Sequence, residues 1–140
     1  MRVCGVDLKG SEALLAIVST DGDKAIHIPC ATKRIALSDD KDAEAVRAFL
    51  QTIRTFHHEN AIDAFAIKSR AHGGKMGGGA VSFKLETLFQ LVECETAFVN
   101  PVALAKFARG NLGVVPESIL RYQEDAYRCA AFHLNRAGEL

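Results

Sequence analysis

The 140-residue sequence has no excess of either charge, no long apolar run and no tryptophan. Basic and acidic residues each number 17, so the net charge is zero, which excludes a polycation that coats nucleic acid by charge alone. No apolar run approaches the ~18 residues that span a bilayer. Asp7 follows the N-terminus too soon for a secretory signal. These absences predict one cytoplasmic domain over residues 1–140, with no membrane segment.

Cysteine pairs with the spacing of metal or redox sites are also absent. The cysteines are widely spaced, which predicts reduced, mostly buried thiols and neither a disulfide framework nor a zinc site: Cys4, Cys30, Cys94 and Cys129. Of the five histidines only His57 and His58 are adjacent. Neighbours on a helix point in different directions, so we expect both on the surface.

The N-terminal part has the pattern of an antiparallel meander. Short β-branched runs at residues 2–8 and 13–19 flank a tight turn at Gly10, and a turn at Gly22 precedes an alternating run over 24–30. Pro29 indicates that the third strand ends there or lies at a sheet edge.

The remaining sequence alternates between helical and strand patterns. The stretch Ser38-Asp39-Asp40 offers an N-cap for a helix that extends to Phe56, and helical spacing returns over 83–92. Residues 62–67 and 96–99 have the pattern of short strands, Asn100-Pro101 opens a helix, and Pro116 opens the last one. The order βββαβαβα predicts an α/β fold with a mixed five-stranded sheet and helices on both faces.

Asp7 is the first candidate site residue, because it lies in an apolar strand where an unpaired acid is costly. It is either a metal ligand at the carboxyl edge of the sheet or a strand-end acid paired with a basic neighbour. Glu124 and Asp125 come next. Asp125 lies at the edge of the apolar stripe of the last helix, where it can point toward the sheet or remain an ordinary boundary acid.

The segment from Lys68 to Lys84 is the third candidate. It contains four basic residues, five glycines within seven positions and no acid, and a helix follows it. It is neither a Walker A loop nor a GxGxxG motif. Exposed amide groups, a helix N-terminus and positive charge suit a phosphate, whereas the alternative is a glycine-rich connection with solvated lysines. The predicted phosphate-binding residues are Lys9, Arg70, Gly73, Gly74, Lys75, Gly77, Gly78 and Lys84.

These features together resemble the ribonuclease H-like fold, and most of all its Holliday-junction-resolvase (RuvC-like) branch. The stretch 6–11 is similar to the first-strand motif of that branch, and 124–134 resembles its last helix, with an acid followed by alanines and a late histidine. More narrowly, Leu8-Lys9-Gly10, the stretch 78–84 and the stretch 123–126 look like a family of small bacterial proteins classed as a domain of unknown function. The resemblance implies a metal site at Asp7 and Asp125, with Glu124 as a further acid.

One residue departs from the resolvase pattern. Lys68 stands where that branch has a catalytic Glu, and a fixed ammonium repels Mg²⁺ and can itself pair with Asp7. We therefore expect a nucleic-acid (DNA or RNA) or phosphate-anion binding protein with a degenerate metal site and no cofactor.

Two alternatives stay open at this point. One is a Mg²⁺- or Mn²⁺-dependent nuclease of the resolvase type, with catalytic residues Asp7, Asp125 and Glu124. The other is a homodimeric interaction protein without nucleic acid. Its basis is the apolar stripe of the helix after the glycine-rich segment, which carries Phe83, Leu85, Leu88 and Phe89.

Overall fold

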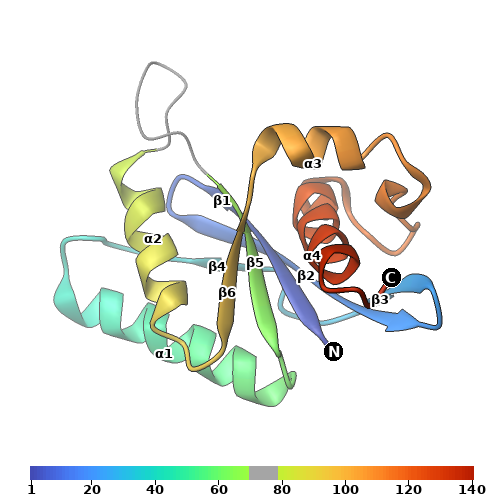
Figure 1. The fold of residues 1–140 in the computed structure, drawn as a ribbon. Helices are drawn as coiled ribbons and strands as arrows, with labels where there is room; N and C mark the ends of the chain where they lie inside the picture. Colours follow the sequence, from blue (N-terminus) through green and yellow to red (C-terminus); the bar gives the residue numbers. More distant parts are fainter. Residues whose placement is uncertain (70–78) are drawn as a thin grey trace.

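The chain forms a mixed β-sheet between two layers of helices, in a computed structural model that describes residues 1–69 and 79–140 (Figure 1). The strands are β1 (Val3–Lys9), β2 (Glu12–Asp21), β3 (Lys24–Ile28), β4 (Arg34–Ala36), β5 (Ala64–Lys68) and β6 (Glu95–Val99). The helices are α1 (Ala43–Glu59), α2 (Ala80–Gln90), α3 (Pro101–Phe107) and α4 (Glu124–Arg136), with short 3₁₀ turns at Asn111–Gly113 and Arg121–Gln123. The predicted mixed sheet with helices on both faces is confirmed.

The main strands lie in the order β3-β2-β1-β5-β6. The meander β1-β2-β3 is antiparallel, and β5 and β6 run parallel to β1. Each hairpin of the meander closes through two residues, and Gly10 and Gly22 take positive φ at the first of them, a conformation that glycine adopts at little cost. The third strand ends at Ile28, before Pro29, as predicted.

A short additional strand, β4, pairs with the first residues of β2 on the same side as β3. The sequence pattern does not predict it, because three residues with one buried side chain, Ile35, are too short for an alternating signal.

Two helix starts differ from the sequence prediction. Asp42 caps α1, rather than a residue of Ser38-Asp39-Asp40, and its side chain accepts a hydrogen bond from the amide of Glu44. The last helix begins at Glu124 instead of Pro116, because Leu120 has extended backbone angles and its amide donates to Gln123 Oε1 (3.0 Å). By contrast, Asn100 caps α3 as expected, accepting from two amides of the first turn.

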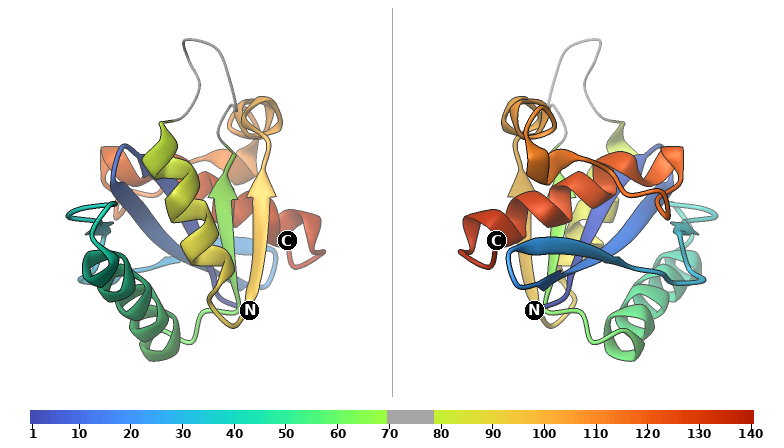
Figure 2. Two further views of the ribbon diagram at one scale, coloured as in Figure 1. Left: turned by 90° about the vertical axis from the view of Figure 1, so that its left-hand side faces the viewer. Right: turned by 90° about the vertical axis from the view of Figure 1, so that its right-hand side faces the viewer.

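Helices α1 and α2 cover one face of the sheet with large side chains (Figure 2). The ring of Phe89 lies 5.0 Å from that of Phe65 and 6.1 Å from that of Phe49, both in edge-on geometry. His57 is half-buried, with its ring 6.4 Å from that of Phe65, whereas His58 is exposed. Only His58 therefore fits the surface position expected of both.

The apolar stripe of α2 is buried within the chain. Leu85 and Phe89 are fully buried, Leu88 is 6% exposed and Phe83 is half-buried. The stripe therefore packs into the core between α1, α2 and the sheet, and is not the open surface on which the homodimer prediction was based. Within the described residues no helix is both long and apolar enough to cross a membrane.

Helix α4 covers the other face, where a row of small residues crosses four strands. Ala16, Gly5, Ala66 and Ala97 are register partners on β2, β1, β5 and β6. A Cβ on Gly5 would overlap the carbonyl oxygen of Ala126 in α4. The missing side chain thus lets the helix backbone lie directly on β1.

Candidate functional site

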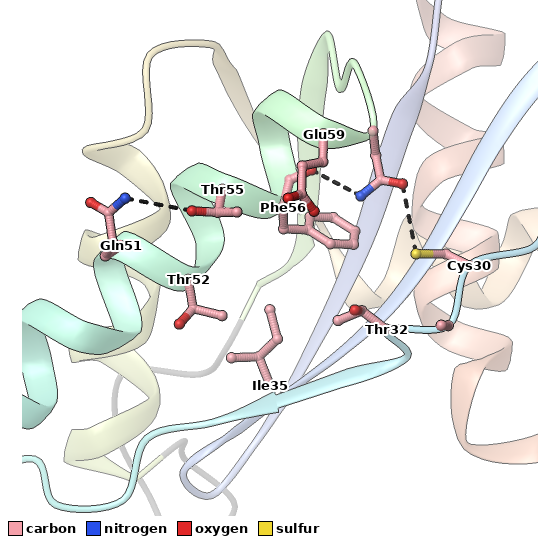
Figure 3. Close-up of a pocket in the computed structure, with 10 residues that line it drawn as sticks. Cys30, Thr32, Ile35, Gln51, Thr52, Thr55, Phe56 and Glu59 are labelled. Carbon is pink, nitrogen blue, oxygen red and sulfur yellow. Dashed lines mark hydrogen bonds between the residues drawn. The ribbon is translucent and has the colours of Figure 1, made fainter.

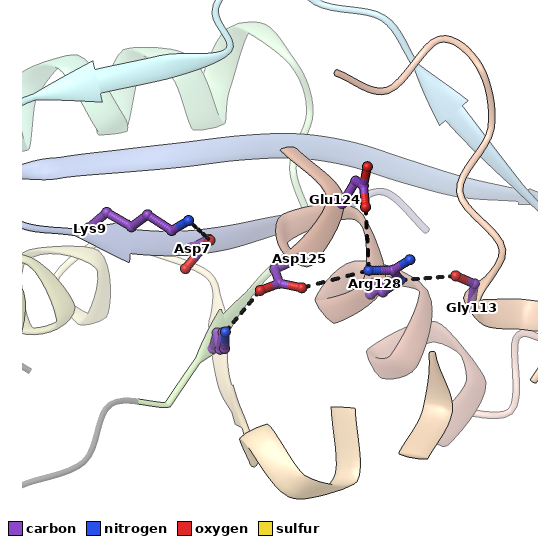
Figure 4. Close-up of polar contacts among 7 residues, drawn as sticks. Asp7, Lys9, Gly113, Glu124, Asp125 and Arg128 are labelled. Carbon is purple, nitrogen blue, oxygen red and sulfur yellow. Dashed lines mark hydrogen bonds and ion pairs between the residues drawn. The ribbon is translucent and has the colours of Figure 1, made fainter. Parts of the chain in front are cut away.

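The close approach of α4 to β1 brings charged side chains together at the carboxyl ends of β1 and β5. Alternation along β1 places Cys4, Val6 and Leu8 on the α1 and α2 face, so Gly5 and Asp7 face α4. Asp7 is 2% exposed, and its Oδ2 lies 3.8 Å from Nζ of Lys9, whose side chain is mostly in solvent. Asp7 and Asp125 reach this region from β1 and α4 (Figure 4).

Lys68 joins this group from the end of β5. Val6 and Ile67 are the last registered pair of β1 and β5, so Asp7 and Lys68 follow as neighbours on the face that α4 covers. The Nζ of Lys68 donates to Oδ2 of Asp125 at 2.9 Å. The sequence interpretation paired Lys68 with Asp7, but the carboxylate that holds its ammonium group belongs to α4, because Gly5 admits that helix so closely.

The protonation of Lys68 follows from these neighbours. Burial alone would lower its pKa, but the hydrogen bond and charge of Asp125, together with the charge of Asp7, outweigh burial and raise the pKa above its ordinary value. Lys68 therefore carries a full positive charge at neutral pH.

Arg128 joins Lys9 and Lys68 as a third cation beside these acids, and the sequence analysis did not identify it. Its Nη1 lies 3.7 Å from Glu124 Oε1 and 3.8 Å from Asp125 Oδ1. Its Nε donates to the carbonyl of Gly113 at 3.1 Å, which orients the guanidinium (Figure 4). The i, i+3 and i, i+4 spacing from two acids is the signal that could have found it.

Cys129 lies beneath the carboxylates and is fully buried. Burial raises its pKa, and the charges of Asp7 and Asp125 raise it further, while Lys68 acts in the opposite sense. The thiol is therefore protonated, which is not the state of a nucleophile or a metal ligand.

The remaining predicted phosphate-binding residues lie elsewhere or outside the described part of the chain. Lys84 Nζ donates to the carbonyl of Asp40 (2.6 Å) and lies 3.4 Å from its Oδ2, so it ties α2 to the chain before α1. Arg70, Gly73, Gly74, Lys75, Gly77 and Gly78 lie outside the described residues.

Among the described residues, the charged cluster therefore consists of the acids Asp7, Glu124 and Asp125 and the cations Lys9, Lys68 and Arg128. Across residues 1–69 and 79–140, no three His, Cys, Asp or Glu side chains come together in a way that could hold a metal ion. Asp7, Asp125 and Glu124 therefore do not form such a group of three, and the metal site at Asp7 and Asp125 stays a prediction.

Solved structures share this fold along the whole chain. The RuvC structure of Thermus thermophilus superposes with a TM-score of 0.74 at 15% identity, covering 99% of this chain and 97% of that one. The same protein in complex with Holliday junction substrate gives 0.67 at 17% identity, over 99% and 96% of the two chains. The fowlpox virus Holliday junction resolvase gives 0.52 at 11% identity, with both chains covered completely. The fold is therefore ribonuclease H-like, as the sequence resemblance implied.

Sequence comparison gives the narrower relationship. No curated protein matches the sequence significantly. The family model described as "Protein of unknown function (DUF3010)" matches residues 1–133, which include all the described members of the charged cluster. The chain belongs to the DUF3010 family.

Proposed function

We propose that this protein binds the phosphate backbone of nucleic acid at the carboxyl ends of β1 and β5 without cleaving it. The observation that carries the proposal is the 2.9 Å ion pair between Lys68 and Asp125. It puts a fixed ammonium group among the acids, where a nuclease of this fold would need divalent cations.

Electrostatics support the absence of metal chemistry. In-line displacement at phosphorus with two metal ions requires several carboxylates free to coordinate them. Here Asp125 accepts from Lys68 and lies beside Arg128, and the raised pKa of Lys68 keeps its charge in place. A carboxylate that is paired with two cations in this way does not fit a pair of divalent ions.

The same cations support phosphate binding. The side chain of Lys9 is 62% exposed, and Lys68 and Arg128 retain partial exposure. Gly79 is the N-cap of α2 and has no side-chain oxygen that could accept from the first amides of the helix. The first turn of α2 carries no acid. Both features favour an anion at the start of this helix. By sequence, Arg70 and Lys75 add two further basic residues. One structural neighbour binds a branched DNA, so we extend the proposal to duplex and branched nucleic acid.

Fluorescence anisotropy with labelled single-stranded, duplex, hybrid and four-way-junction oligonucleotides tests the binding. We expect affinity to fall steeply with salt because phosphate contacts release counterions. Lys9→Gln and the pair Arg70→Gln/Lys75→Gln should weaken binding and flatten the salt dependence. Lys24→Gln, at the exposed hairpin between β2 and β3, is the matched control and should bind as the native protein does. Loss of affinity in the control alone, or in none of the variants, would contradict the proposal.

A cleavage assay separates this proposal from the nuclease alternative. Incubation of the same substrates with Mg²⁺ or Mn²⁺ should leave them intact. Lys68→Glu removes the ammonium and adds a carboxylate beside Asp7 and Asp125, so its affinity for Mn²⁺, measured by calorimetry, should exceed that of the native protein. Metal-dependent cleavage by the native protein, abolished in Asp7→Asn, would establish the nuclease instead.

Two further parts of the proposal concern location and assembly. All four cysteines are free thiols, which supports work in the reducing cytoplasm. Phe98 and Val102 remain exposed apolar residues around the end of β6 and the start of α3, which supports a homodimer. Light scattering at two protein concentrations tests the dimer, and a monomer at both contradicts it.

A further inference from the structure

A pocket of about 410 Å³ lies between the C-terminal half of α1 and the chain from Cys30 to Ile35 (Figure 3). It is on the face of the sheet that α1 and α2 cover, away from the charged cluster that α4 covers. Its volume falls within the range of small-molecule sites.

The side chains on both walls of the pocket are short or polar, and they leave this space open. Thr52, Thr55 and Glu59 are spaced i, i+3 and i+7 on α1, so they line one face beside the buried stripe. Ala31 and Thr32 stand on the opposite wall. None of these five side chains is long and apolar, so the tight packing of the core stops at this edge.

The floor is apolar and one end is fixed by hydrogen bonds. Ile35 and Phe56, both less than 9% exposed, form the floor. At one end the thiol of Cys30 donates to Asn60 Oδ1 at 3.7 Å, and Nδ2 of Asn60 donates to the carbonyl of Phe56 at 3.0 Å. These two bonds hold that end of the pocket in place.

The lining selects the charge of an occupant. Glu59 is the one acidic residue of this lining, which includes no basic residue, and the other polar groups are hydroxyls, amides and a thiol. An anion would meet a carboxylate and no cation, so a nucleic-acid backbone is excluded from this pocket.

From this geometry we propose that the pocket is a second binding site, for a small uncharged or monocationic molecule with a flat apolar body and hydrogen-bonding groups at its edge. The apolar body lies on Ile35 and Phe56, and the hydroxyls of Thr32 and Thr55 bond its polar edge. A positive charge, where present, faces Glu59.

Three probes of matched shape test the charge selection: benzamide, benzylamine and benzoate. In ¹H–¹⁵N NMR titrations, benzamide and benzylamine should shift the amide signals of Thr32, Thr52 and Asn60 with a Kd on the order of 1 mM, the range for ligands of this size. Benzoate should leave these signals in place. Equal shifts with benzoate, or no shifts at these residues with any probe, overturn the proposal.

Two variants locate the site. Thr52→Leu fills the pocket and should weaken benzamide binding by about tenfold or more. Thr87→Leu is the matched control, because both threonines are exposed helical residues whose hydroxyls donate to the carbonyl four residues back; it should bind as the native protein does. Glu59→Gln should weaken the binding of benzylamine and leave that of benzamide unchanged. Unchanged binding in Thr52→Leu, with the native spectrum otherwise retained, places the probe elsewhere and overturns the proposal.

Discussion

The two faces of the sheet differ in the size of their side chains, which are large on one face and small on the other. The face beneath α1 and α2 is filled by large apolar residues, with the rings of Phe49, Phe65 and Phe89 in contact. The face beneath α4 carries a row of alanine and glycine across four strands, and the helix opposite contributes Ala126, Cys129 and Ala130.

The two faces therefore contribute differently: one mainly stabilises the fold, and the other positions the charged side chains. Large side chains bury more apolar area, which is the main stabilising contribution to a fold. Small side chains give up area but let backbones approach. On the α4 face the approach at Gly5 brings Asp125 to Lys68 and Asp7, so the charged cluster is a consequence of residues that have little or no side chain.

Truncating the large-residue face should have the greatest effect on stability. Phe65 is fully buried, so Phe65→Ala should lower the free energy of unfolding by about 3–5 kcal/mol, through lost burial and the cavity left behind. Urea denaturation measures this. Phe98→Ala, at a residue 42% exposed on the edge strand, is the control and should cost less than about 1 kcal/mol. Equal losses for the two variants would mean that ring packing does not distinguish the faces.

Adding a single methyl group to the small-residue face should cause the second-largest loss of stability. In Gly5→Ala the new Cβ overlaps the carbonyl of Ala126, so α4 must move and we expect a loss of about 3 kcal/mol, at the upper end for overpacking. Gly79→Ala, whose Cβ would meet open space, should change stability by less than about 1 kcal/mol. Denaturation of the two variants side by side checks the pair. A mild effect at Gly5 would show that α4 is not held by backbone contact.

Removing the charge of Lys68, one cation of the charged cluster, should affect nucleic-acid binding more than stability. Lys68 and Asp125 are both partly exposed, so Lys68→Met should change the free energy of unfolding by less than about 1 kcal/mol. The loss of one phosphate contact should weaken duplex binding about tenfold near ~0.1 M salt. Denaturation and anisotropy on one preparation give both values. A large stability loss with unchanged binding would assign Lys68 a structural role alone.

The smallest expected effect is that of pH on stability through the Lys68–Asp125 pair, because this contribution hardly changes near neutral pH. Because the pKa of Lys68 is raised in the folded state, its pair with Asp125 contributes fully below the ordinary lysine value of 10.5 and is lost only as pH rises through the raised pKa. A ¹³Cε NMR titration should therefore show a midpoint above 10.5. In Asp125→Asn the midpoint should fall. An identical midpoint in both proteins would contradict the ion pair.

Most of the fold could be predicted from local sequence patterns. The meander follows from β-branched runs and glycine turns, and α3 from Asn100-Pro101. The start of α4 could not be predicted this way. Pro116 is typical of a first helical turn, but the bond from the amide of Leu120 to the buried Gln123 holds an extended residue in between. Since Gln123 also donates to the carbonyl of Leu15 on β2, that helix start depends on a contact distant in sequence.

The members of the candidate site were largely predictable, but their pairing was not. Asp7 stands out because an acid is costly in an apolar strand, Asp125 because it lies at the edge of an apolar helix stripe, and Lys68 because it stands where the resolvase resemblance has a Glu. Arg128 was missed although its spacing from Glu124 and Asp125 indicates it. Gly5 was missed as well, although a glycine inside a strand often marks a close backbone approach.

The sequence by itself determined most of the elements, the apolar stripe that each helix carries and most of the charged residues that could meet, because these depend on periodicity and turn chemistry within a few residues. Only the tertiary structure decided that Lys68 bonds to Asp125, that α2 buries its stripe and that a pocket opens beside Thr52. Each of these depends on the distance between backbones far apart in the chain, which packing sets and local sequence does not encode.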